Sequence, residues 1–186
     1  TSGCHTSADS VIVQIKNYTL DTIDFSTDPV TVNASVTGPN PMVFAPVTVN
    51  SGTLATGMTL NVFIASSYNM SATGTYTFNA FTSVTGDGNA SNDTMPPVNI
   101  DISGGTATSS ITNLCLGNNA VLTVSGNTAG GTVQWQDSPD NITFTNIPGA
   151  TNTTYTASPS TLTYYRSITC GTDSSTSDTV NVIVVA

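Results

Sequence analysis

The stretch CLGNNAVLTVSGNTAGGTVQWQD, residues 115–137, decides the fold of this chain. Leu122 and Val124 alternate with hydroxyl-bearing residues, and Trp135 shares a phase with Val133. Alternation with a period of two is typical of half-buried β-strands, and the Gly and Asn residues between the two runs are typical of turns. We therefore expect strands at about 120–125 and 132–137, with Trp135 inside the second.

The same alternation extends over the whole chain, and helical periodicity does not occur. Val30, Val32, Ala34 and Val36 alternate with polar residues. Clusters of Gly, Pro, Asn and Ser separate such runs. The pattern predicts an all-β protein with further strands at about 11–16, 30–37, 43–49, 58–65, 75–84, 98–102, 110–115, 142–146, 153–157, 162–170 and 177–185.

The segment Ser103-Gly104-Gly105-Thr106-Ala107 interrupts the alternation and is the best candidate for a linker. About seven strands precede it and about seven follow it, which is the number expected of a β-sandwich of roughly a hundred residues. We expect two tandem immunoglobulin-like β-sandwiches, at residues 1–103 and 108–186, joined by a short linker.

The composition excludes several classes of partner. Two basic residues stand against eleven acidic ones, all of them Asp, and the net charge is −9. Nucleic acid binding needs clustered Lys and Arg, so it is not expected. No apolar run approaches the ~20 residues of a membrane-spanning helix, so membrane insertion is not expected either. Abundant Thr favours strands over helices.

The cysteines and the tryptophan follow the order Cys115, Trp135, Cys170. In immunoglobulin-like sandwiches a buried indole packs near a disulfide that joins the two sheets. This order predicts a Cys115–Cys170 bridge beside a core Trp135, and hence an oxidising compartment. Cys4 is left over. We expect its partner in a preceding module, with a free thiol or an intermolecular bridge as the alternatives.

Two resemblances refine this interpretation. CLGNNAVLTVSG, VQWQDSPDNITFTNIPGATNTTYTASP, LTYYRSITCG and TSDTVNVIV, over about 110–185, closely resemble an immunoglobulin-like repeat of large secreted and surface proteins of Bacteroidota. The first half resembles a cell-adhesion-related bacterial sandwich domain, mainly through GTYTFNAFTSVTGDGNASNDT at 74–94. The second half departs from antibody-type domains in that Cys115 precedes the second strand instead of lying within it. Another departure is that Ile168, not Tyr, stands two residues before Cys170.

These resemblances imply a non-catalytic extracellular module, a spacer or adhesive repeat of a large surface or secreted protein exported by type IX secretion. Expected partners are neighbouring modules of a longer chain, surface polysaccharide or other copies of the chain. One alternative is a subunit of a self-assembling surface filament, in which an edge strand or the hydrophobic segment Val180–Val185 pairs with a neighbouring subunit. Another is a carbohydrate-binding accessory domain of a secreted enzyme. An exposed aromatic platform would favour that role.

Catalysis and cofactor binding have little support in the sequence. His5 is the only histidine, and no pair of Asp residues lies in a pocket-forming pattern. We expect no enzyme and no cofactor, with calcium as the one ion to consider. Oxygen ligands for calcium are offered by Asp87, Asn89, Asn92 and Asp93. The alternative is that these residues only form a turn.

A short glycosylation motif completes the sequence analysis. Bacteroidota exported proteins carry O-glycans on a Ser or Thr that follows Asp and precedes an apolar residue. The resemblance therefore implies sugar on at least one of Ser10, Thr22, Thr94 and Thr179, each expected at the edge of a strand.

Overall fold

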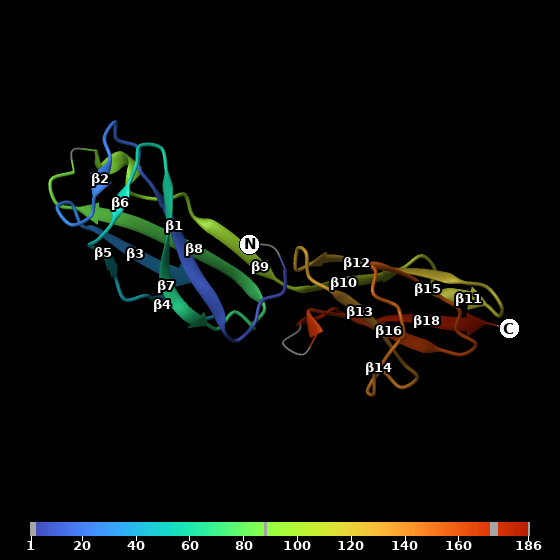
Figure 1. The fold of residues 1–186 in the computed structure, drawn as a ribbon. Helices are drawn as coiled ribbons and strands as arrows, with labels where there is room; N and C mark the ends of the chain where they lie inside the picture. The colour runs from blue at the N-terminus through green and yellow to red at the C-terminus, as the bar shows by residue number, and fades with distance from the viewer. Residues whose placement is uncertain (1–2, 88, 172–174, 186) are drawn as a thin grey trace. The chain divides into compact units, whose positions relative to one another are not determined.

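The computed structural model describes residues 3–87, 89–171 and 175–185. The protein is all-β: 53% of it is strand, and the described residues contain no α-helix, only the 3₁₀ turn η1 (Ala90–Asn92). Within these ranges no helix has the length and apolarity needed to cross a bilayer. Two compact units form (Figure 1), the first from Ser7–Met70 and Thr75–Ile100, the second from Thr1–Thr6, Ser71–Gly74 and Asp101–Ala186.

The first unit, here called the first sandwich, places its core between two sets of strands. One set pairs β1 (Asp9–Lys16) with β7 (Thr59–Tyr68), beside a short β2 (Ile23–Asp24) and β6 (Thr53–Leu54) ladder. The other runs β4 (Met42–Val43), β3 (Val30–Thr37), β8 (Gly74–Val84), β9 (Val98–Ile102), with β5 (Val47–Val49) also on β3. Side chains from both sets form the core: Ile15, Phe25, Val30, Val32, Leu54 and Val62.

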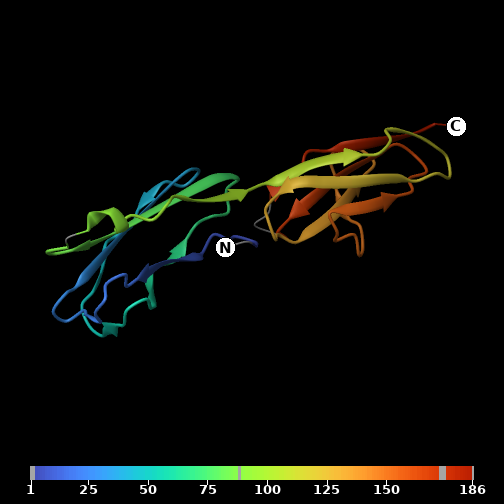
Figure 2. The same cartoon turned by 90° about the horizontal axis from the view of Figure 1, so that it is seen from above.

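The second sandwich has sheets of three and six strands, which can be followed in Figures 1 and 2. The smaller contains β10 (Gly104–Ser109), β12 (Ala120–Asn127) and β15 (Thr154–Ala157). The larger runs β11 (Asn113–Cys115), β18 (Val180–Val185), β16 (Thr163–Thr169), β13 (Val133–Ser138), β14 (Thr145–Asn146), with β17 (Ser175–Thr176) on β16. Trp135, Leu122 and Val182 meet in its core.

The predicted alternation is confirmed most clearly in β3, where Val30, Val32, Ala34 and Val36 are all buried. The strand predicted at 43–49 is instead split. Met42–Val43 pair with one end of β3, Val47–Val49 pair with the other, and Pro46 lies between them. Proline has no N–H to give to the ladder, so the pairing is interrupted there.

The linker predicted at 103–107 is wrong, because these residues form most of β10 and pair with β12. The second sandwich therefore begins before residue 108, and the N-terminal segment up to Thr6 belongs to it rather than to the first. Gly104 is required for close packing, not for flexibility. A Cβ there would lie 2.0 Å from the carbonyl oxygen of Thr176. Glycine permits this close backbone approach, which the sequence pattern does not distinguish from a flexible joint.

Candidate functional sites

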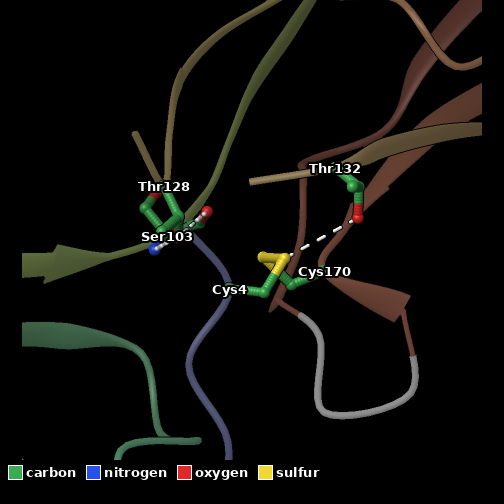
Figure 3. Close-up of a disulfide and its surroundings, with 5 residues drawn as sticks. All are labelled: Cys4, Ser103, Thr128, Thr132 and Cys170. Atoms are coloured by element: carbon green, nitrogen blue, oxygen red, sulfur yellow. Dashed lines mark hydrogen bonds between the residues drawn. A yellow bond between two sulfur atoms is a disulfide. The ribbon is translucent and has the colours of Figure 1, made fainter. Parts of the chain in front are cut away.

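The protein's disulfide joins Cys4 to Cys170, with Cα atoms 5.2 Å apart. The predicted Cys115–Cys170 bridge is wrong, and Cys115 is an exposed free thiol. The expectation that Cys4 pairs outside this chain is wrong too. Figure 3 shows the bridge between the N-terminal segment and the end of β16.

Strand register explains why Cys115 does not reach Cys170. β11 runs parallel to β18 and aligns Cys115 with Val185, at the end of β18. β16 runs antiparallel and aligns Tyr165 with Val180, so Cys170 lies beyond the opposite end of β18. At about 3.3 Å per residue the two cysteines are roughly 30 Å apart along the sheet, whereas a disulfide needs Cα atoms within about 7 Å.

Backbone hydrogen bonds hold both halves of the bridge in place. Gly3 N donates to Ala129 O at 2.8 Å, and Cys170 N donates to Thr132 O at 2.7 Å. The Thr132 hydroxyl lies 3.7 Å from Cys4 Sγ (Figure 3). The N-terminal segment is thus attached to the β12–β13 connection as well as to β16.

A second attachment lies nearby, where the chain enters β10. Ser103 N donates to the Thr128 hydroxyl at 2.9 Å, and this hydroxyl donates to Ser103 O at 3.1 Å. Thr128 N donates to the same carbonyl at 2.9 Å. Thr128 is buried, and its bonds to Ser103 attach the residue before β10 to the β12–β13 connection (Figure 3).

Trp135 is a core residue, as the sequence predicts, with 0% of its surface exposed. Its indole Nε1 donates to Asn152 O at 3.0 Å, so the polar edge of the buried ring is satisfied. Burial also raises the pKa of the neighbouring core residue Tyr165 to about 12. Neither ring can serve as an external platform for a sugar.

Three of the four residues proposed for calcium accept hydrogen bonds, and the fourth, Asn92, ends the 3₁₀ turn η1. Asp87 Oδ1 accepts from Asn89 N at 2.9 Å, and Asn89 Oδ1 accepts from the Ser91 hydroxyl at 2.6 Å. Asp93 accepts from Thr82 through both its backbone and its side chain. In the described part of the chain no three His, Cys or Asp side chains form a group that could hold a metal ion. Calcium binding by this loop stays a prediction, tested by whether a chelator lowers the melting temperature.

A cavity of about 430 Å³ opens beside this loop in the first sandwich. Carboxylates from two separate segments line it, with Lys16 as its basic residue: Asp21, Asp28, Asp87 and Asp93. The adjoining loop is fixed from within by Asn17, whose buried amide donates to Asp21 O and Leu54 O at 2.8 Å each. The carboxylates give the cavity a negative potential, which disfavours anionic ligands.

Exposed aromatic rings occur in the first sandwich. Phe81 is 50% exposed on the outer face of β8, directly opposite Asn33 of β3. The neighbouring outward pair is Ser35 and Asn79, so the ring lies among uncharged hydrogen-bonding groups. Phe63, 63% exposed, lies opposite the exposed Ile12 on the β1–β7 ladder. Sequence analysis overlooked both rings, although the alternation could have found them, because Phe81 is out of phase with the buried Ala80 and Phe63 with the buried Val62.

The two basic side chains also contact aromatic rings. Lys16 Nζ lies 4.8 Å from the centre of the Tyr18 ring. The Arg166 guanidinium lies 4.1 Å from the centre of the Phe144 ring, and its Nε donates to Gln136 at 2.8 Å. Each cation is therefore held by a cation–π contact.

All four residues predicted to carry O-glycans are exposed. Ser10 lies in β1, Thr94 forms an isolated bridge with Phe81, and Thr22 and Thr179 immediately precede β2 and β18. A sugar could be added at each without disturbing a core. The modification itself stays a prediction.

The expectation that Val180–Val185 pairs with a neighbouring subunit is wrong, whereas filament assembly through another edge strand stays a prediction. β18 lies between β11 and β16 in the sheet, so it is an internal strand. The sheet ends instead at β11 and β14, which have three and two residues. Edges this short offer little template for another chain.

Comparison with known proteins gives one family match. Residues 103–186 match a family described as a domain of unknown function (DUF8696), and the match begins where Ser103 contacts Thr128. No curated protein matches the chain. A solved structure of murine CEACAM1b is 13% identical, with 82% of this chain and 85% of that chain covered and a TM-score of 0.36.

Two further solved structures are similar to the chain at comparable levels. A two-domain fibronectin type-III segment of chicken tenascin is 10% identical and covers 100% of this chain and 97% of its own, with a TM-score of 0.31. The Yersinia pseudotuberculosis adhesin InvE is 12% identical, and its alignment covers 100% of this chain and 56% of that one, with a TM-score of 0.33.

Proposed function

We propose that this chain is a non-catalytic structural module of an extracellular protein, located at the cell surface or secreted. The observation that carries the proposal is the Cys4–Cys170 disulfide. Disulfides form and persist in oxidising compartments and are rare in the cytosol. The bridge attaches a terminal segment to a β-sandwich, so its contribution is to the stability of the fold.

The chemistry of the described side chains supports a structural rather than a catalytic role. The carboxylates of Asp87, Asp93 and Asp140 accept hydrogen bonds within their own loops or from the adjacent strand. Burial raises the pKa of Tyr165 away from neutrality, and the pKa of Asp140 is lowered to about 2 by Thr143 N, Ile142 N and the Ser138 hydroxyl. General acid–base work needs a pKa near the working pH instead.

Surface exposure of the protein tests this proposal. Antibodies against the purified chain should bind intact cells that encode it, or should detect it in their medium, and external protease should remove the cell-bound signal. Detection only after the cells are permeabilised would contradict an extracellular location. A cytosolic marker protein serves as the control for cell integrity.

The finer assignment is a spacer or adhesive repeat of a Bacteroidota surface protein, exported by type IX secretion. It rests on the sequence resemblance and on the exposure of Ser10, Thr22, Thr94 and Thr179. Intact mass of the natively purified protein tests the glycan. A mass above that of the bare polypeptide, lost in the Ser10→Ala, Thr22→Ala, Thr94→Val or Thr179→Val variants, is expected. A mass equal to the bare polypeptide would contradict it.

One observation favours a second candidate function, binding of a neutral polysaccharide. Phe81 projects from a sheet face whose neighbouring outward side chains, Asn33, Ser35 and Asn79, are uncharged. An exposed ring flanked by amides and hydroxyls is the combination that stacks on and hydrogen-bonds to a sugar. Phe81→Ala should weaken binding to an insoluble neutral glycan about tenfold, the equivalent of about 1.4 kcal/mol. Phe63→Ala is the matched control. Equal binding by both variants and the wild type would exclude the Phe81 face.

A further inference from the structure

The disulfide makes a covalent ring that contains the whole first sandwich. Cys4 and Cys170 are 166 residues apart in sequence, and both belong to the second sandwich. Every residue of the first sandwich, from Ser7 to Ile100, lies between them along the chain. A path along covalent bonds from the chain before Cys4 to the chain after Cys170 therefore need not pass through the first sandwich.

We propose that the Cys4–Cys170 bond diverts tensile load around the first sandwich. Force that enters before Cys4 and leaves after Cys170 crosses the disulfide and continues along the chain through β17 to β18. The first sandwich then bears none of this load and stays folded under tension. The use of this device in a cell rests on the proposed structural role, whereas the load path is a property of the chain and can be measured separately.

Beyond Cys170, β18 is the element that resists the load. Cys170 lies beyond the Val180 end of β18, because Tyr165 of the antiparallel β16 pairs with Val180. Load leaves the strand at its other end, where Val185 pairs with Cys115. Tension therefore acts along β18. Its hydrogen bonds to β16 on one side, and to β11 and the preceding Thr112 on the other, cross the strand direction and are loaded together rather than one at a time. Val182, fully buried in the core, adds side-chain packing.

Reduction of the Cys4–Cys170 bond would return the first sandwich to the load path. Cys4 is exposed and Cys170 is half-buried, so a small thiol can approach the bridge. Attack by one thiolate of dithiothreitol breaks the S–S bond and forms a mixed disulfide, and its second thiol then closes the oxidised ring of the reagent and releases both cysteines as thiols. The chain between Cys4 and Cys170 then enters the load path.

Single-molecule pulling tests the proposal. Handles are attached at the two ends of the chain in a Cys115→Ser background, which removes the free thiol without touching the bridge. The oxidised protein should release only the chain after Cys170, at most about 60 Å at about 3.5 Å per residue. With dithiothreitol the additional 166 residues should raise the released length above about 500 Å. A Cys4→Ser/Cys170→Ser variant should match the reduced protein.

The final extended length between the handles distinguishes the outcomes even if the reduced second sandwich is already unfolded, because this length does not depend on folding. Release of more than about 500 Å by the oxidised protein would overturn the proposal and leave the extracellular role untouched. A positive control moves one handle into the first sandwich, through Ser51→Cys in the exposed turn after β5. Pulled from there, the oxidised protein should show unfolding of the first sandwich.

A substitution in β18 tests which element bears the load. Ile183 N donates to Thr112 O at 2.7 Å, and Ile183→Pro removes this donor. The oxidised variant should rupture at lower force than the wild type. Ile183→Ala keeps the N–H at the same exposed position and should rupture at nearly the wild-type force. Equal rupture forces for the proline and alanine variants would show that load does not pass through the β18 hydrogen bonds.

Discussion

The first sandwich builds part of its interior from aromatic rings, whereas the second has one large buried indole and a covalent bridge. In the first, Tyr68 makes edge-to-face contacts with Phe44, Tyr76 and Phe78 at ring-centre distances of 5.5, 6.2 and 6.0 Å. In the second, Trp135 fills the core and Cys4–Cys170 fixes the N-terminal segment. The stability of the second sandwich therefore depends on redox conditions, and that of the first does not.

The largest expected effect follows from removal of the indole. Trp135→Ala should destabilise the second sandwich by about 3–5 kcal/mol, because the ring is fully buried and leaves a cavity. Calorimetry should show the transition of the second sandwich at lower temperature and that of the first unchanged. Trp135→Phe is the control with a smaller loss. A shift of both transitions would contradict the separation of the two cores.

Loss of the disulfide should have the next largest effect. Cys4→Ser/Cys170→Ser should lower the stability of the second sandwich by about 2–4 kcal/mol, since the unfolded chain regains the entropy that the bridge removes. The only tryptophan lies in this sandwich, so its fluorescence during urea unfolding reports on this unit. Cys115→Ser is the matched control and should unfold like the wild type. An unchanged free energy of unfolding in the double variant would show that the bridge does not stabilise the second sandwich.

Hydrogen bonding by one tyrosine provides the corresponding test in the first sandwich. The hydroxyl of Tyr68 donates to Asn40 O, and burial raises the pKa of this tyrosine. Tyr68→Phe keeps the ring cluster and leaves the carbonyl without its donor, which should cost about 1–2 kcal/mol. Tryptophan fluorescence should not change, whereas far-ultraviolet circular dichroism should detect earlier unfolding. Tyr18→Phe, at an exposed position, is the control.

The smallest expected effect is a loss of stability at acidic pH that depends on Asp140. Backbone N–H groups of Thr143 and Ile142 lower the pKa of Asp140 from 3.8 to about 2. A carboxylate with a depressed folded-state pKa stabilises the fold above pH 3.8 and loses that contribution as the pH falls toward about 2. The wild type should therefore lose stability in this window. Asp140→Asn should lose less, because it has no charge to titrate. Identical pH profiles would contradict this role for Asp140.

Sequence reasoning predicted the strands better than the joints between them. Alternating residues such as Val30 and Val32 report directly on which face is buried, and Trp135 in phase with Val133 reports on the core. The domain boundary was mispredicted at Gly104, because a glycine that permits close backbone packing looks the same in sequence as one in a flexible linker.

The disulfide was mispredicted for a different reason. The order Cys, Trp, Cys matches a known arrangement, but pairing depends on strand register in three dimensions. The parallel alignment of β11 with β18 places Cys115 beside Val185, and no local pattern encodes that alignment. The contact of Gly3 with Ala129 is likewise a long-range feature. The exposed rings of Phe81 and Phe63, by contrast, could have been predicted, because each is out of phase with the buried residues of its strand.

The contacts of Lys16 and Arg166 with aromatic rings bear on resistance to digestion. Trypsin cleaves only after Lys and Arg, so this chain of 186 residues offers it two bonds. Both bonds lie at strands, one at the end of β1 and one inside β16, and both side chains are held against rings. A protease of this specificity must extract a cation from its ring and a backbone from its sheet before it can cut. The scarcity of basic residues thus protects the folded protein in surroundings rich in such proteases.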